Sequence, residues 1–155
     1  MLTLALILGY IDSMIPMPVP VAGIKLGLAN LVILYGIYRL KVTDTILISL
    51  IRVILSGLMF AGLSGIIFSM AGAVLSLAVM YIMKRFTNYH IITISVCGSL
   101  AHIMGQLIVA GSIMGMNIIP YYAPILMLSA LLAGAIIGIL DTVILDRTAG
   151  INISE

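Results

Sequence analysis

The amino-acid sequence predicts an all-α integral membrane protein, a six-transmembrane-helix bundle that forms a single domain over residues 1–155. Composition is the first reason, because only 8% of the residues are charged and 63% are hydrophobic, whereas soluble domains carry about 25% charged residues. Long apolar runs separated by short polar gaps are the second reason. These runs lack the strict alternation of membrane-barrel strands, and a bilayer core favours helices because they satisfy their own backbone hydrogen bonds.

Six apolar runs follow one another along the chain. The first covers residues 2–15 and is shorter than the roughly 20 residues of a perpendicular span, so flanking residues would have to complete it. Prolines at positions 16, 18 and 20 end it, since alternate prolines cannot continue a helix. The other five runs are of spanning length and cover residues 23–40, 43–60, 64–83, 91–110 and 121–145.

The basic residues predict the orientation of the bundle. With six spans, five of them fall at one end, and only Lys25, in the gap after the first run, falls at the other. Cytoplasmic loops carry the excess of Lys and Arg, so we expect both termini in the cytoplasm and the protein in the cell membrane. The five residues at the shared end are Arg39, Lys41, Lys84, Arg85 and Arg147.

Arg52 is the most informative polar residue, because it lies near the middle of the third run. It is roughly 13 Å along the helix from the start of that run, too deep to reach an interface easily. Thr45, Ser49 and Ser56 share its helical face, and such a polar face should turn towards the bundle interior. Two interpretations stay open: an ion pair, with Asp12 as its partner, or a contact to an anionic or polar substrate.

Other polar residues interrupt the apolar runs in the same way. His102 and Gln106 are one turn apart in the fifth run, and Asn30 interrupts the second. Asp141 lies near the inner end of the sixth run, where we expect it to pair with a basic loop. We predict no metal site and no cofactor. The predicted substrate-binding residues are Lys25, Asn30, Arg52, His102 and Gln106, supported by Asp12, Ser49 and Ser56.

Small residues at four-residue spacing predict surfaces where helices approach closely. One such series is Ala130, Gly134 and Gly138, and another covers positions 65, 69 and 73. We expect these two inside the bundle. The pair Ala5 and Gly9 on the first run could instead face a partner subunit.

Two stretches carry a family resemblance. PVAGIKLGLANLVILYGIYRL at 20–40 and LIRVILSGLMFAG at 50–62 resemble the membrane family described as Gx transporters or as heptaprenyl diphosphate synthase component I. That family looks related to the substrate-binding (S) components of energy-coupling factor (ECF) transporters. The resemblance implies six helices, cytoplasmic termini and a substrate site near the outer face, beneath the first loop. It also implies docking through the first helix, where Ala5 and Gly9 match a family motif of two alanines four apart, with glycine in place of one alanine.

The leading hypothesis is therefore a substrate-binding subunit that captures a small amphiphilic or anionic molecule from outside. Its implied partners are an ECF transmembrane subunit and two ATPase subunits, because the chain has no Walker A sequence of its own. The alternative is an accessory, non-catalytic membrane component of a prenyl diphosphate synthase. Catalysis by this chain alone is not expected, since its scattered aspartates form no magnesium-binding cluster. A membrane scaffold is a third possibility, and the net charge of +2 does not suggest nucleic acid.

Overall fold

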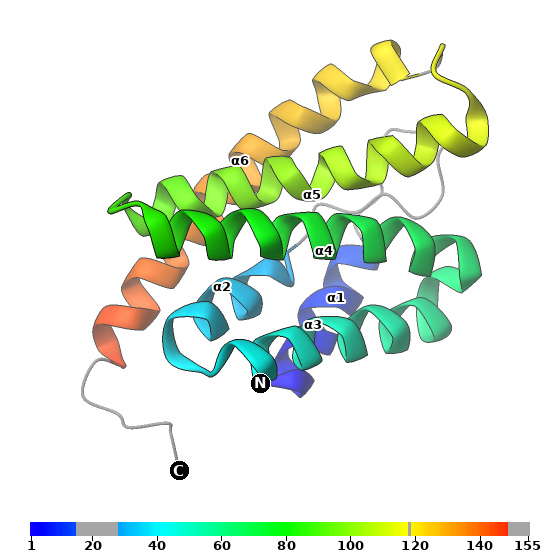
Figure 1. Cartoon of the computed structure of the whole chain (residues 1–155). Helices are drawn as coiled ribbons and strands as arrows, with labels where there is room; N and C mark the ends of the chain where they lie inside the picture. The colour runs from blue at the N-terminus through cyan, green and yellow to red at the C-terminus, as the bar shows by residue number, and fades with distance from the viewer. Residues whose placement is uncertain (15–27, 118, 149–155) are drawn as a thin grey trace.

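The computed structural model describes residues 1–14, 28–117 and 119–148, and the regular elements in these ranges are all helical (Figure 1). This confirms the all-α class. The predicted Lys25 site and the start of the second apolar run lie outside the described residues. In chain order the elements are α1 (Leu2–Met14), α2 (Asn30–Arg39), α3 (Val42–Ser56), the π-helical segment η1 (Gly57–Ala61), α4 (Gly62–Phe86), α5 (Ile91–Met114) and α6 (Ile119–Arg147).

Within the described residues, four stretches are long and apolar enough to cross a membrane: Val42–Phe60, which joins α3 to η1, and the helices α4, α5 and α6. The other two helices are short, with 13 residues in α1 and 10 in α2. At 1.5 Å per residue they extend about 20 and 15 Å, less than the roughly 30 Å of a bilayer core. The described helices therefore support a multi-pass membrane protein with four spans, and the expected count of six stays a prediction.

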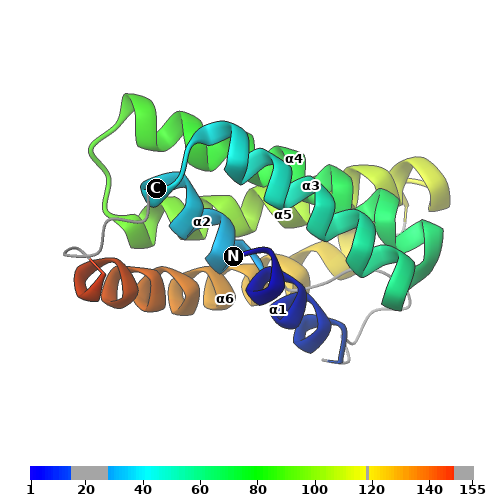
Figure 2. The same cartoon turned by 90° about the horizontal axis from the view of Figure 1, so that it is seen from below.

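The short helix α2 lies at the centre of the bundle, between α3 and α6 (Figure 2). It contacts every other described α-helix, whereas α1 packs only against α2, α3 and η1. Ile33, Leu34 and Ile37 of α2 form one core cluster with Met80 of α4 and Ile94 of α5. α2 therefore packs inside the bundle and contributes to its apolar core.

Close approach of α4, α5 and α6 depends on glycine. A Cβ atom added to Gly134 would lie 2.8 Å from the Cα of Val96, and one added to Gly138 would lie 2.7 Å from the Cα of Ile92. On the other side of α5, a Cβ on Gly105 would lie 2.6 Å from the carbonyl oxygen of Ala71. The small residues of the sixth run therefore make the expected internal contact.

Three helix ends meet at the basic end of the bundle. The Lys84 ammonium group of α4 donates a hydrogen bond to the carbonyl oxygen of Ile37 near the end of α2. The Arg39 guanidinium group of α2 donates to the carbonyl oxygen of Leu145 near the end of α6, at 3.1 Å. Two residues that the sequence assigned to a shared end thus lie at that end together.

Candidate functional site: a buried polar cavity around Arg52

Arg52 projects from α3 into the bundle, and only 6% of its surface is exposed. Thr45, Ser49 and Ser56 on the same face are buried as well. The remaining faces of α3 carry exposed apolar side chains such as Leu47 and Ile54, which suit contact with lipid. The polar face of the third run is therefore turned inward, as its spacing predicts.

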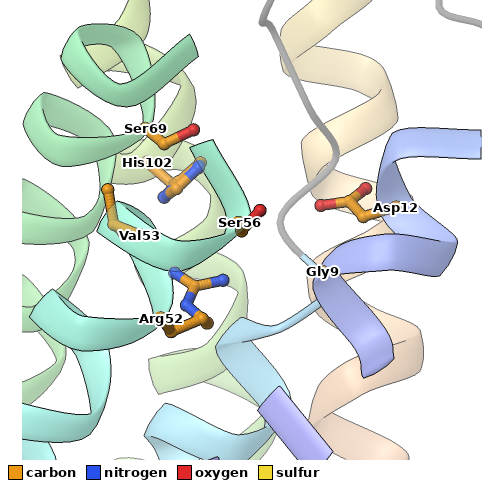
Figure 3. Close-up of a pocket in the computed structure, with 7 residues that line it drawn as sticks. All are labelled: Gly9, Asp12, Arg52, Val53, Ser56, Ser69 and His102. Atoms are coloured by element: carbon orange, nitrogen blue, oxygen red, sulfur yellow. The ribbon is translucent and has the colours of Figure 1, made fainter. Parts of the chain in front are cut away.

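A small cavity of about 20 Å³ lies in front of the Arg52 side chain (Figure 3). This central cavity is lined by residues from four helices. Its volume is about that of one water molecule, which is too small for a larger ligand in this conformation. The lining residues are Gly9 and Asp12 of α1, Arg52, Val53 and Ser56 of α3, Ser69 of α4 and His102 of α5.

Opposite charges face this cavity from different helices. Asp12 of α1 is 4% exposed, and its carboxylate acts electrostatically on the Arg52 guanidinium group. The Nε atom of Arg52 has no hydrogen-bond partner among the described residues. Since a guanidinium group has five N–H donors and always carries its charge, Arg52 has donor capacity that its described surroundings do not use.

His102 of α5 lines the central cavity, and its ring contacts the side-chain amide of Gln106 one turn further along the helix. Nε2 of His102 lies 3.1 Å from Nε2 of Gln106, so the amide can donate to the ring when the ring proton sits on the other nitrogen. A Cβ atom on Gly72 would lie 2.9 Å from Cε1 of His102. The imidazole therefore occupies space that only a glycine on α4 leaves open.

The structure brings together only part of the predicted site. Asp12, Arg52, Ser56 and His102 line the central cavity, and Gln106 reaches it through His102. Asn30 instead donates a hydrogen bond to Ser76 Oγ at 3.4 Å and is not among the lining residues. Ser49 lines a separate, mainly apolar groove of about 240 Å³ between α3 and α4.

Two residues that line the central cavity, Gly9 and Ser69, were not predicted from the sequence to belong to the site. Ser69 belongs to the small-residue series of the fourth run and was expected only to pack helices, and Gly9 was expected to face a partner subunit. In the structure Ala5 is 0% exposed, and a Cβ on Gly9 would lie 3.5 Å from Ser56 Oγ. In this conformation both residues are buried, with Gly9 against α3, and neither is accessible to a partner, so docking through them stays a prediction.

Comparison with known proteins identifies the family. The family model described as heptaprenyl diphosphate synthase component I matches residues 1–144, which confirms the resemblance found in the sequence. No curated protein and no solved structure matches the chain.

Proposed function

The chain belongs to the heptaprenyl diphosphate synthase component I family, and from this premise we propose that it is a substrate-binding membrane subunit of an ECF-type transporter. The observation that carries the proposal is the buried Arg52 in a polar cavity walled by α1, α3, α4 and α5. The proposed substrate is a small amphiphilic or anionic molecule taken from outside, with the guanidinium group as its main polar anchor.

The cost of burial supports a ligand role for Arg52. A charged side chain in the middle of a membrane bundle is expensive and usually marks a pathway, a relay or a binding site. Asp12 offsets part of that cost, but Ser56, Ser69 and His102 extend the polar wall beyond what one ion pair needs. Polar groups placed so that they converge on one space fix the orientation of a ligand in small-molecule sites.

The central cavity is too small for a substrate and has to enlarge before one can bind. α1 is the wall best suited to move, because it packs only against α2, α3 and η1 among the described elements. Its displacement would take Gly9 and Asp12 away from Arg52 and enlarge the space in front of the guanidinium group. We propose that capture and release correspond to this opening and closing of α1.

The test is the small-molecule content of the purified protein, measured by mass spectrometry after denaturation. The parent should release a compound that Arg52→Gln lacks and that Arg85→Gln, altered at an exposed arginine, retains. The same compounds in all three preparations would contradict the assignment of Arg52. A ligand-free Arg52→Gln protein destabilised by roughly 3–5 kcal/mol and rescued by Asp12→Asn would show a structural ion pair instead.

The family description also favours a second candidate, an accessory membrane component of a prenyl diphosphate synthase. A protein described as component I implies another component as its partner. We distinguish the two candidates by affinity purification from native membranes. Co-purified ATPase subunits with a transmembrane subunit would support the transporter, whereas a co-purified prenyl synthase without ATPases would support the accessory role.

A further inference from the structure

Asp141 is a buried ionisable residue that does not line the central cavity. It lies on α6 and is 0% exposed. The sequence predicted a pairing with a basic loop, but neither carboxyl oxygen has a hydrogen-bond partner in the described part of the chain. Within that part the predicted pairing is therefore wrong.

The helices packed against α6 show why the pairing fails. Arg39 of α2 is a basic residue that contacts α6, and its guanidinium group donates to the carbonyl oxygen of Leu145, one turn beyond Asp141. Tyr35 of α2 donates its hydroxyl proton to Thr148 Oγ1 at 3.3 Å. These two ionisable groups of α2 that face α6 are thus already engaged with the last turn of that helix.

The α5 residues that face α6 provide no charged partner for Asp141. The α5 residues that pack against Gly134 and Gly138 are Ile92, Ser95, Val96 and Ser99, none of which titrates. His90 before α5, and Asp146 and Arg147 at the end of α6, are exposed. An ionised carboxylate at position 141 would therefore be buried without hydrogen bonds from the described residues, a state that proteins avoid by neutralising the group.

We propose that Asp141 is a proton-binding site, occupied by a proton while α2, α5 and α6 are packed as in this structure. The neutral acid fits an apolar helix interface because it carries no net charge. Loss of the proton would leave a buried anion, which must gain a cation or water. Arg39 is the group placed to respond, since its present acceptor is only about 6 Å further along the helix. Proton release would therefore draw Arg39 from Leu145 and loosen the contact between α2 and α6.

Infrared spectroscopy of the purified protein in lipid tests the proposal directly. The parent should show a carboxylic-acid C=O band at neutral pH that disappears in Asp141→Asn and remains in Asp146→Asn, the exposed aspartate on the same helix. If Asp141→Asn fails to fold, Asp141→Glu should shift that band instead. A band that is missing from the parent, or unchanged in both the Asn and the Glu variant, would overturn the assignment.

Thermal melting as a function of pH gives the second measurement. A packed bundle that binds this proton more tightly than the unfolded chain is stable at low pH and loses stability as the pH rises. The parent should therefore lose more stability than Asp141→Asn between mildly acidic and mildly alkaline buffer, and the two should melt alike at the acidic end. An Asp141→Asn protein that melts far below the parent at every pH would show that an ionised, partnered carboxylate is required.

Discussion

At the scale of single residues, Arg39 and Lys84 each donate a hydrogen bond to a carbonyl group near the C-terminal end of another helix. The last carbonyl groups of a helix lack partners within it, and cations are favourable there because of the helix dipole. Lys84 of α4 donates to Ile37 near the end of α2, and Arg39 of α2 donates to Leu145 near the end of α6. Arg39 and Lys84, which in the sequence predict the orientation of the bundle, thus also connect three helices by hydrogen bonds.

Replacing Arg39 tests this contribution. Arg39→Met keeps an apolar stem of similar length but removes the donor to Leu145, and we expect the free energy of unfolding to fall by about 1 kcal/mol. The measurement is thermal or denaturant unfolding in detergent at low pH. The matched control is Arg85→Met, since Arg85 is exposed at the same end of the bundle. Equal stability of the two variants would mean that the bond to Leu145 contributes nothing.

At the scale of helices, the sequence predicted the longest elements well. The run at 91–110 corresponds to the helix Ile91–Met114, and the run at 121–145 corresponds to the helix Ile119–Arg147. These helices were predictable because polar gaps mark the ends of their apolar runs. The π-helical segment Gly57–Ala61 was not predicted. It depends on packing: a Cβ on Gly57 would lie 2.1 Å from Cγ1 of Ile66, and Gly62 takes a φ of 68°. Neither the contact of Gly57 with Ile66 nor the backbone angle of Gly62 can be inferred from a hydropathy pattern.

The interface between α5 and α6 makes a prediction at this scale. Gly134→Val would place side-chain atoms against the backbone of Val96, and overpacking of this kind costs roughly 1–3 kcal/mol. We expect a lower melting temperature in detergent. Leu132→Val, an exposed position on the same helix, should melt close to the parent. A tolerated Gly134→Val would mean that α5 and α6 can separate freely.

Gly9 distinguishes internal packing of α1 from docking. A methyl group at Gly9 would make ordinary contact with Ser56, whereas a leucine would have to fit into the cavity of about 20 Å³ that Gly9 lines. Gly9→Ala should therefore keep the parent stability, and Gly9→Leu should lower it even when no partner is present. If Gly9→Leu instead melts like the parent and loses only the co-purification of a transporter module, α1 presents this face to a partner, as the family resemblance implies.

At the scale of the whole molecule, the sequence could predict which residues are polar and inward but not which of them meet. The spacing around Arg52 was sufficient to predict its buried face. Ser69 and His102 join it because α4 and α5 approach closely at Gly72 and Gly105, and Asn30 is separated because α2 begins beside Ser76. Such distances follow from how helices cross, and a single sequence does not encode them in a readable pattern.

The orientation of the whole bundle in the membrane is the last prediction. Helix α5 has 24 residues and extends about 36 Å, enough to cross a bilayer, so Tyr89 before it and Tyr121 after it should lie on opposite sides. Both are exposed, which makes them suitable for cysteine labelling once the single native cysteine, Cys97, is replaced by alanine. Because the basic residues Lys84 and Arg85 are near Tyr89, we expect Tyr89→Cys on the cytoplasmic side.

A membrane-impermeant maleimide should label Tyr121→Cys in intact cells and Tyr89→Cys only after permeabilisation. Labelling of both from one side would contradict a membrane-spanning α5, and the reverse pattern would invert the proposed direction of capture.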